Sequence, residues 1–117
     1  MTRRMIKAPE TLTKRSDFVR LNKGGKQVRA AFVLRYQRND HDLPRIGVTA
    51  SKKIGNAVAR NRAKRRLRAA IRACHPRLNG QGFDINIIAR SHIFDIAHAE
   101  LLKDLAHCFE IIGGEDK

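Results

Sequence analysis

The sequence has no tryptophan and few other aromatic residues, with five Phe and one Tyr among 117 residues. A surface that stacks many bases is therefore not expected, and any base contact must depend on one or two rings. Cysteine is also scarce. Cys74 and Cys108 each lie in an apolar helical pattern, which is typical of buried, reduced thiols and not of a disulfide framework.

The sequence also lacks the usual marks of an active site or of a membrane protein. The five histidines show no metal-binding spacing with the cysteines, and no glycine-rich phosphate loop opens a helix. Asp84 and Asp95 stand apart among apolar or loop neighbours, so they do not indicate a two-metal site. No apolar run reaches the length of a membrane span, and the start of the chain has no signal-peptide core. These absences predict a cytoplasmic protein without a catalytic residue or metal ligand of its own.

Acidic residues are absent from Leu43 to Phe83, although the whole chain carries eleven of them. The same region holds the most basic stretch, Ser51 to Arg72, in which eleven residues are Lys, Arg or Asn. The net charge of the chain is +14 and its isoelectric point is about 11.1. Such a charge balance is typical of proteins that bind nucleic acid.

The basic stretch has the pattern of one amphipathic helix. Gly55 can supply a turn, and Asn56 can cap the helix start by accepting a hydrogen bond from a free backbone N–H. A solvated helix face is the ordinary interpretation of a charge run, but such faces mix signs, whereas this one stacks like charges. The pattern therefore predicts a helix that binds a polyanion. The apolar stripe on its other side consists of Ala59, Ala63, Leu67, Ala70, Ile71 and Cys74.

The rest of the pattern predicts one domain over residues 12–117 after a flexible tail over residues 1–11. Strand alternation turns Phe32, Leu34 and Tyr36 to one face and Val33 and Arg35 to the other. The expected helices span Thr13 to Asn22, the basic stretch, and Ile96 to Ile112 with Asp95 as a cap; the expected strands span Gln27 to Arg38, Arg45 to Ser51 and Phe83 to Arg90.

These elements predict the order α-β-β-α-β-α, with room for one further strand before the basic helix. The expected architecture is a two-layer α/β sandwich of the α+β class with a small mixed sheet. We expect the first two strands to form an antiparallel pair.

The run from Arg45 to Arg68, RIGVTASKKIGNAVARNRAKRRLR, closely resembles the protein-subunit family of bacterial ribonuclease P. The family pattern is a strand ending in Ser-Lys-Lys, then Gly-x-Ala-Val, then Arg-Asn-Arg-x-Lys-Arg and a further Arg one turn later. All of these positions match in register, and a weaker resemblance covers about Leu12 to Arg90.

The resemblance implies both a fold and an activity. The family's fold contains a strand–helix–strand connection with a left-handed crossover, whereas such connections are usually right-handed. Family members are the small protein half of a ribonucleoprotein that removes the 5′ leader from precursor tRNA. The RNA half holds the catalytic Mg²⁺ ions. The implied partners are ribonuclease P RNA and precursor tRNA, and we expect no membrane contact and no protein partner.

The resemblance also implies roles for individual residues. Phe18, Val33 and Arg35 match the positions that take the single-stranded leader, although an ordinary core position remains the alternative for Phe18. Two positions depart from many relatives, since Asn22 and Arg35 stand where those carry aromatic rings. The positions that match the catalytic-RNA-binding surface are Lys52, Lys53, Arg60, Asn61, Arg62, Lys64, Arg65 and Arg68.

Two other classes of function remain as alternatives. The first is a non-catalytic RNA-binding protein, such as a ribosomal protein or RNA chaperone, because the same fold serves several functions. The second is a DNA-binding helix-turn-helix protein. That class needs a partner helix just before the recognition helix, and residues 45–51 have the pattern of a strand instead.

Overall fold

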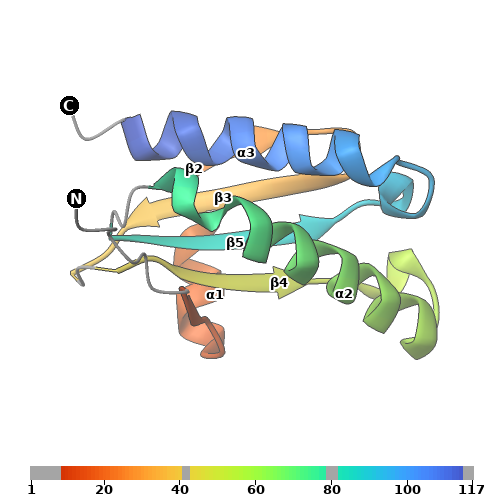
Figure 1. Cartoon of the computed structure of the whole chain (residues 1–117). Helices are drawn as coiled ribbons and strands as arrows, with labels where there is room; N and C mark the ends of the chain where they lie inside the picture. The colour runs from red at the N-terminus through yellow and green to blue at the C-terminus, as the bar shows by residue number, and fades with distance from the viewer. Residues whose placement is uncertain (1–8, 41–42, 79–81, 115–117) are drawn as a thin grey trace.

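The computed structural model describes residues 9–40, 43–78 and 82–114, which fold around one five-stranded sheet (Figure 1). β1, β4 and β5 run parallel to one another, and β3 runs antiparallel to both of its neighbours, β5 and β2. In spatial order the strands are β1 (Glu10–Thr11), β4 (Arg45–Thr49), β5 (Phe83–Ala89), β3 (Phe32–Arg38) and β2 (Gly25–Val28).

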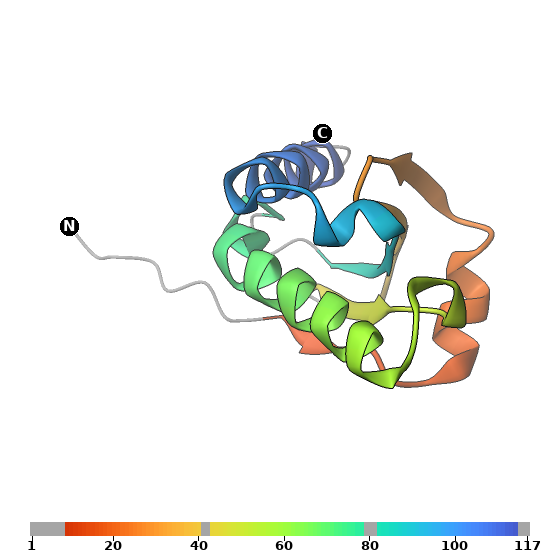
Figure 2. The same ribbon diagram turned by 90° about the vertical axis from the view of Figure 1, so that its right-hand side faces the viewer.

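Three α-helices cover the sheet, and they divide between its two faces. Figures 1 and 2 show α2 and α3 side by side on one face and α1 on the other. The expected α/β sandwich with a small mixed sheet is confirmed, and α1 adds a short layer behind it. The helices are α1 (Arg15–Leu21), α2 (Ala57–Cys74) and α3 (His98–Gly114); short 3₁₀ turns are η1 (Lys52–Ile54), η2 (His75–Leu78) and η3 (Ser91–Phe94).

The core lies between the sheet and the α2–α3 layer. Leu34, Ile85 and Ile87 point into it from β3 and β5, and all three are fully buried. Leu67 of α2 and Phe109 of α3 meet them from the helix side, also without exposure. Full burial of such a side chain contributes about 1.5–3 kcal/mol, so this layer makes a large contribution to stability.

The connection from β4 through α2 to β5 joins two neighbouring parallel strands. In Figure 1 both strands run to the right with β5 above β4, and α2 returns in front of the sheet. This path is left-handed, as the resemblance implied, although nearly all such crossovers in proteins are right-handed.

The expected strand pairing was wrong in two respects. Residues 27–38 form no single strand; β2 and β3 make a hairpin, with the Arg29 N–H donating to the Phe32 carbonyl oxygen at 2.8 Å. β3 and β4 do not pair, because β5 lies between them. β5 is buried on both faces, and such an apolar strand takes the central position of a sheet.

The ends of the elements also differ from the expected ones. Glu10 and Thr11, assigned to a flexible tail, pair with β4 as β1, while residues 1–8 lie outside the described part. Asp95 does not cap the last helix, because it follows η3 and α3 begins only at His98. None of the helices in the described ranges is both long enough and apolar enough to cross a membrane.

Candidate nucleic-acid interface

The start of α2 is built as the sequence predicted. The Asn56 side chain accepts a hydrogen bond from the Ala59 N–H at 2.9 Å, which satisfies one of the free donors of the first turn. Gly55 precedes it with a φ of 142°, a conformation that favours glycine. The cap therefore fixes where the helix begins and which face turns outward.

The apolar stripe of α2 packs against the core and leaves the basic side in solvent. Ala63, Leu67, Ala70, Ile71 and Cys74 are buried, as expected, whereas Ala59 is only half-buried. We call the opposite side, together with η1, the basic ridge. It comprises the exposed Lys52, Lys53, Asn61, Arg62, Arg65 and Arg68 and the half-buried Arg60 and Lys64.

The cations of the basic ridge have no acidic partners among the described residues. None of them forms an ion pair with a carboxylate within residues 9–40, 43–78 and 82–114. The Arg62 guanidinium lies over the Phe94 ring, 5.9 Å from its centroid, and Arg60 has a buried Nε without a hydrogen-bond partner in that part of the chain. An 18-residue helix is about 27 Å long, so the ridge presents a row of unneutralised charge to a ligand.

One arginine of α2 has a different role. Arg66 turns inward and donates hydrogen bonds to the carbonyl oxygens of Ile93 and Ile96, the second at 3.0 Å. These bonds tie α2 to η3 and to the turn that leads into α3. Arg66 was not among the expected RNA-binding residues, and its inward position agrees with that choice.

The three expected leader-binding residues share the α1 side of the sheet. Val33 and Arg35 of β3 are both half-buried and lie beside Ile88 and Asn86 of β5. Phe18 projects from α1 over β4, so close that a Cβ on Gly47 would lie 2.7 Å from its ring. Because Gly47 is the β4 partner of Asn86, the Phe18 ring and Arg35 stand two strands apart on one surface.

The structure also shows the surroundings of Asn22 and Arg35, the two positions that depart from many relatives. Asn22 is exposed at the end of α1, where it forms the C-cap, and Arg35 is half-buried on the sheet. The described part of the leader-binding surface therefore has one ring, Phe18, beside a planar guanidinium that can itself stack.

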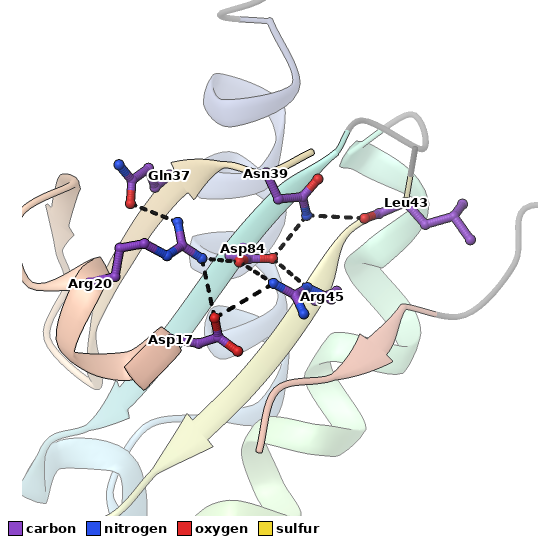
Figure 3. Close-up of polar contacts among 7 residues, drawn as sticks. All are labelled: Asp17, Arg20, Gln37, Asn39, Leu43, Arg45 and Asp84. Atoms are coloured by element: carbon purple, nitrogen blue, oxygen red, sulfur yellow. Dashed lines mark hydrogen bonds and ion pairs between the residues drawn. The ribbon is translucent and has the colours of Figure 1, made fainter. Parts of the chain in front are cut away.

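A buried carboxylate anchors α1 to the sheet, and sequence reasoning missed it (Figure 3). Asp84 of β5 is completely buried and accepts two hydrogen bonds from Arg45, at 2.8 and 2.6 Å. Asn39 donates to it at 2.9 Å, and Arg20 of α1 completes the set. Asp17 lies 3.6 Å from Arg20 and 3.8 Å from Arg45. The sequence feature that could have revealed this cluster is the single acidic residue within the apolar strand FDINIIA.

This cluster holds Asp84 in its charged form. Burial alone would raise the pKa of the Asp84 carboxyl, but hydrogen bonds from Arg45, Asn39 and Arg20 together lower its pKa below the ordinary value. The same contact raises the pKa of Arg45. With its oxygens engaged by three donors, Asp84 is a structural anion and not a general base.

The thiols and the possible metal ligands are the other reactive side chains. Within the described ranges, no three His, Cys, Asp or Glu residues come together as metal ligands. Cys74 and Cys108 are buried and free, as expected, and burial raises the pKa of the Cys108 thiol to about 11. A thiol with that pKa is a poor nucleophile at neutral pH.

Comparison with known proteins agrees with this combination of fold and surface. The model of the family Ribonuclease P matches residues 6–113. The ribonuclease P protein component of Desulforapulum autotrophicum is 38% identical over 109 residues, covering 92% of each chain. The Bacillus cereus protein of the same name is 36% identical over 110 residues, covering 92% of this chain and 95% of its own.

Solved structures give the same result. The RNase P protein of Thermotoga maritima superposes with a TM-score of 0.77 at 29% identity, over 88% of this chain and 97% of that one. The Staphylococcus aureus RNase P protein gives a TM-score of 0.72 at 32% identity, over 86% and 93%. The chain therefore belongs to the Ribonuclease P family, as a bacterial ribonuclease P protein component.

Proposed function

We propose that this chain binds the catalytic RNA of ribonuclease P through the basic ridge and the 5′ leader of precursor tRNA through the α1 side of the sheet. By holding both, it promotes endonucleolytic removal of the leader and formation of the mature tRNA 5′ end. This cleavage takes place in the cytoplasm, where tRNA precursors are processed. The observation that carries the proposal is the row of cations on α2, which lacks any acidic partner in the described ranges.

The basic ridge supports RNA binding through phosphate contacts. Apart from Lys52 and Lys53 of η1, its cations project from one capped helix, whose buried side is fixed by the core, so their spacing is set before the RNA arrives. Neutralising phosphates with such cations releases counterions and makes the affinity depend steeply on salt. Asn61 adds a side chain that can donate and accept hydrogen bonds within the same row.

The α1 side of the sheet supports binding of a single strand. A ring such as Phe18 can stack on one base, and Arg35 can stack by its guanidinium plane or contact a phosphate. Val33 offers an apolar contact beside Arg35 on β3. Because this surface lies on β3, β5 and α1, away from the outward side of α2, one protein can hold the catalytic RNA and the leader simultaneously.

The chemistry is proposed to belong to the RNA. The only fully buried carboxylate among the described residues, Asp84, is engaged by two arginines and an asparagine, which leaves it unsuited to binding Mg²⁺. Among the described residues, the donor set therefore does not fit a resident Mg²⁺ ion. We propose that the RNA holds most of the Mg²⁺ that the holoenzyme requires, and that the protein positions substrate.

The test is reconstitution. The purified protein is added to a bacterial ribonuclease P RNA at low Mg²⁺ concentration, and cleavage of labelled precursor tRNA is followed on a gel. We expect cleavage at the mature 5′ end only when both components are present. A protein that binds the RNA without increasing cleavage would support the alternative, a non-catalytic RNA-binding role.

A further inference from the structure

A hollow lies at the β4 edge of the sheet, on its α2 side, next to the leader-binding surface, with which it shares Phe18. It runs between α2 and the segment 9–13, and we call it the β4–α2 groove. It encloses about 430 Å³, which is within the usual range for small-ligand sites. Its floor is apolar and is formed by Ile46, Val48 and Ile71, while Phe18 reaches its rim around the edge of β4.

One wall of the β4–α2 groove is cationic. Lys64, Arg68 and Arg72 follow one another at four-residue spacing along α2 and line the groove, and none of the described lining residues is acidic. This wall attracts an anion and repels a cation. A bare phosphate would make no favourable contact with the apolar floor. The lining therefore fits a ligand with an anionic part and a flat apolar part.

The edge of β4 adds hydrogen-bonding groups at the floor. The carbonyl oxygens of Pro44 and Ile46 point toward the first strand and accept from the N–H groups of Glu10 and Leu12, both at 3.2 Å. By strand alternation the N–H and C=O of Val48 point the same way. β1 ends at Thr11, opposite Ile46, so no described strand pairs with Val48 on that side.

An unpaired peptide group of this kind presents a donor and an acceptor side by side, as the edge of a nucleobase requires. A side chain adds to it, because His75 lines the groove and its Nδ1 is buried without a hydrogen-bond partner among the described residues. Unsatisfied groups at a pocket are costly unless a ligand or water meets them.

We propose that the β4–α2 groove binds one unstacked nucleotide of the RNA that contacts α2. The base lies on the apolar floor with its edge at the Val48 peptide group, and the phosphate lies along Lys64, Arg68 and Arg72. The identity of that RNA rests on the proposed function, but the groove's preference for a nucleotide does not. Arg72, which the helical pattern places on the cationic side of α2, thereby joins the RNA-binding residues that the family resemblance implied.

The first test uses adenosine 5′-monophosphate as the probe and ribose 5-phosphate as its control, titrated into the ¹⁵N-labelled protein by NMR. The amide signals of Thr11, Val48 and Ile71 should shift and saturate with the nucleotide. The affinity for ribose 5-phosphate should be about tenfold lower, because stacking of a base is lost. Equal affinities, or shifts confined to the outer side of α2 near Asn61 and Arg65, would overturn the proposal.

Two variants with matched controls locate the site. Arg72→Ala removes a groove cation and should weaken nucleotide binding about threefold, whereas Lys103→Ala, an equal loss of charge on α3 outside the groove and the basic ridge, should leave it unchanged. Val48→Ala truncates the floor and should also weaken binding. Val19→Ala, at a position on α1 that is 54% exposed, is its control. Equal effects from a variant and its control would refute the assignment.

A third test compares the affinity of the protein for an RNA hairpin that carries one unpaired adenosine with its affinity for the same hairpin fully paired. The wild-type protein should prefer the bulged RNA about tenfold, and Arg72→Ala should lose most of that preference. Equal affinity for both hairpins would overturn the groove proposal while leaving reconstituted tRNA cleavage untouched. Conversely, nucleotide binding in the groove would persist even if the chain failed to promote cleavage, so the two proposals fail separately.

Discussion

Replacing Asp84 should destabilise the protein more than replacing any exposed acid. Removal of one partner from a buried ion pair typically costs about 3–5 kcal/mol, because the other charges stay behind. Arg20 and Arg45 keep 38% and 22% of their side chains exposed, so they can turn to water when the carboxylate is lost. We therefore expect Asp84→Ala to cost about 3 kcal/mol, the lower end of that range. A domain of this size is stable by about 5–15 kcal/mol, so the loss is large.

Urea unfolding at pH 7, followed by circular dichroism, measures this cost. Asp17→Ala is the matched control, because Asp17 faces the same two arginines at 3.6 and 3.8 Å. Its carboxylate is partly exposed and makes no close contact, so its removal should cost less than about 1 kcal/mol. Asp84→Asn keeps the shape but loses the charge, and should cost about 1.5–3 kcal/mol.

The pH dependence gives an independent check on Asp84. Its folded-state pKa is lowered from 3.8, so its stabilising contribution is complete above that value and is lost as pH falls through the folded pKa. The stability gap between wild type and Asp84→Asn should therefore shrink below about pH 4. A cost for Asp84→Ala no greater than that for Asp17→Ala, or a gap that stays constant in acid, would refute the reasoning.

Three further predictions concern the ridge, the leader surface and the cap. Arg60→Ala and Arg62→Ala should each weaken binding to ribonuclease P RNA while a thermal melt stays nearly unchanged, because neither guanidinium has an acidic partner in the described part. Phe18→Ala should lower the preference of the reconstituted enzyme for precursor over mature tRNA, since a stacking ring contributes about 1–3 kcal/mol. Asn56→Ala should cost about 1 kcal/mol in urea unfolding through loss of the cap.

Each of these predictions has a contrary outcome. If Arg60→Ala or Arg62→Ala unfolds the domain, that arginine is structural and does not belong to the binding face. Equal losses for precursor and mature tRNA, or a collapse of the fold, would place Phe18 in the core. A stability for Asn56→Ala within about 0.3 kcal/mol of wild type would mean that the cap bond contributes nothing.

The features of α2 were predictable because they depend on local sequence. Asn56 caps its own helix three residues on, and Leu67 and Cys74 lie on one face by helical period alone. The alternation that put Val33 and Arg35 on one side of the sheet is local as well, and the structure confirms it. Residue spacing therefore predicted which side of α2 and of β3 would be available to a ligand.

Strand order could not be read in the same way. Period-two alternation states which side chains share a face, but it does not state which strand lies alongside. β5 comes late in the chain, yet it lies between β3 and β4 because both of its faces can be buried. β1 contributes only Glu10 and Thr11, too few residues to show any period.

The Asp84 cluster and the β4–α2 groove depend on contacts between distant parts of the chain. Arg20, Asn39 and Arg45 reach Asp84 from across 64, 45 and 39 residues. Such a set appears only once the strand order is known. The lone acid of β5 signals that some partner must exist, because a buried charge is costly without one, but it does not say which.

The central claim, that the basic ridge carries the RNA contact by charge, is tested most directly by the salt dependence of binding. The affinity for ribonuclease P RNA is measured from low to high salt for wild type and for a variant combining Arg62→Ala, Arg65→Ala and Arg68→Ala. The account predicts a steep log–log slope for wild type and a decrease of about two to three in its magnitude for the variant, at about 0.7–0.9 per lost phosphate contact. A wild-type slope near zero, or an unchanged slope in the variant, would contradict it.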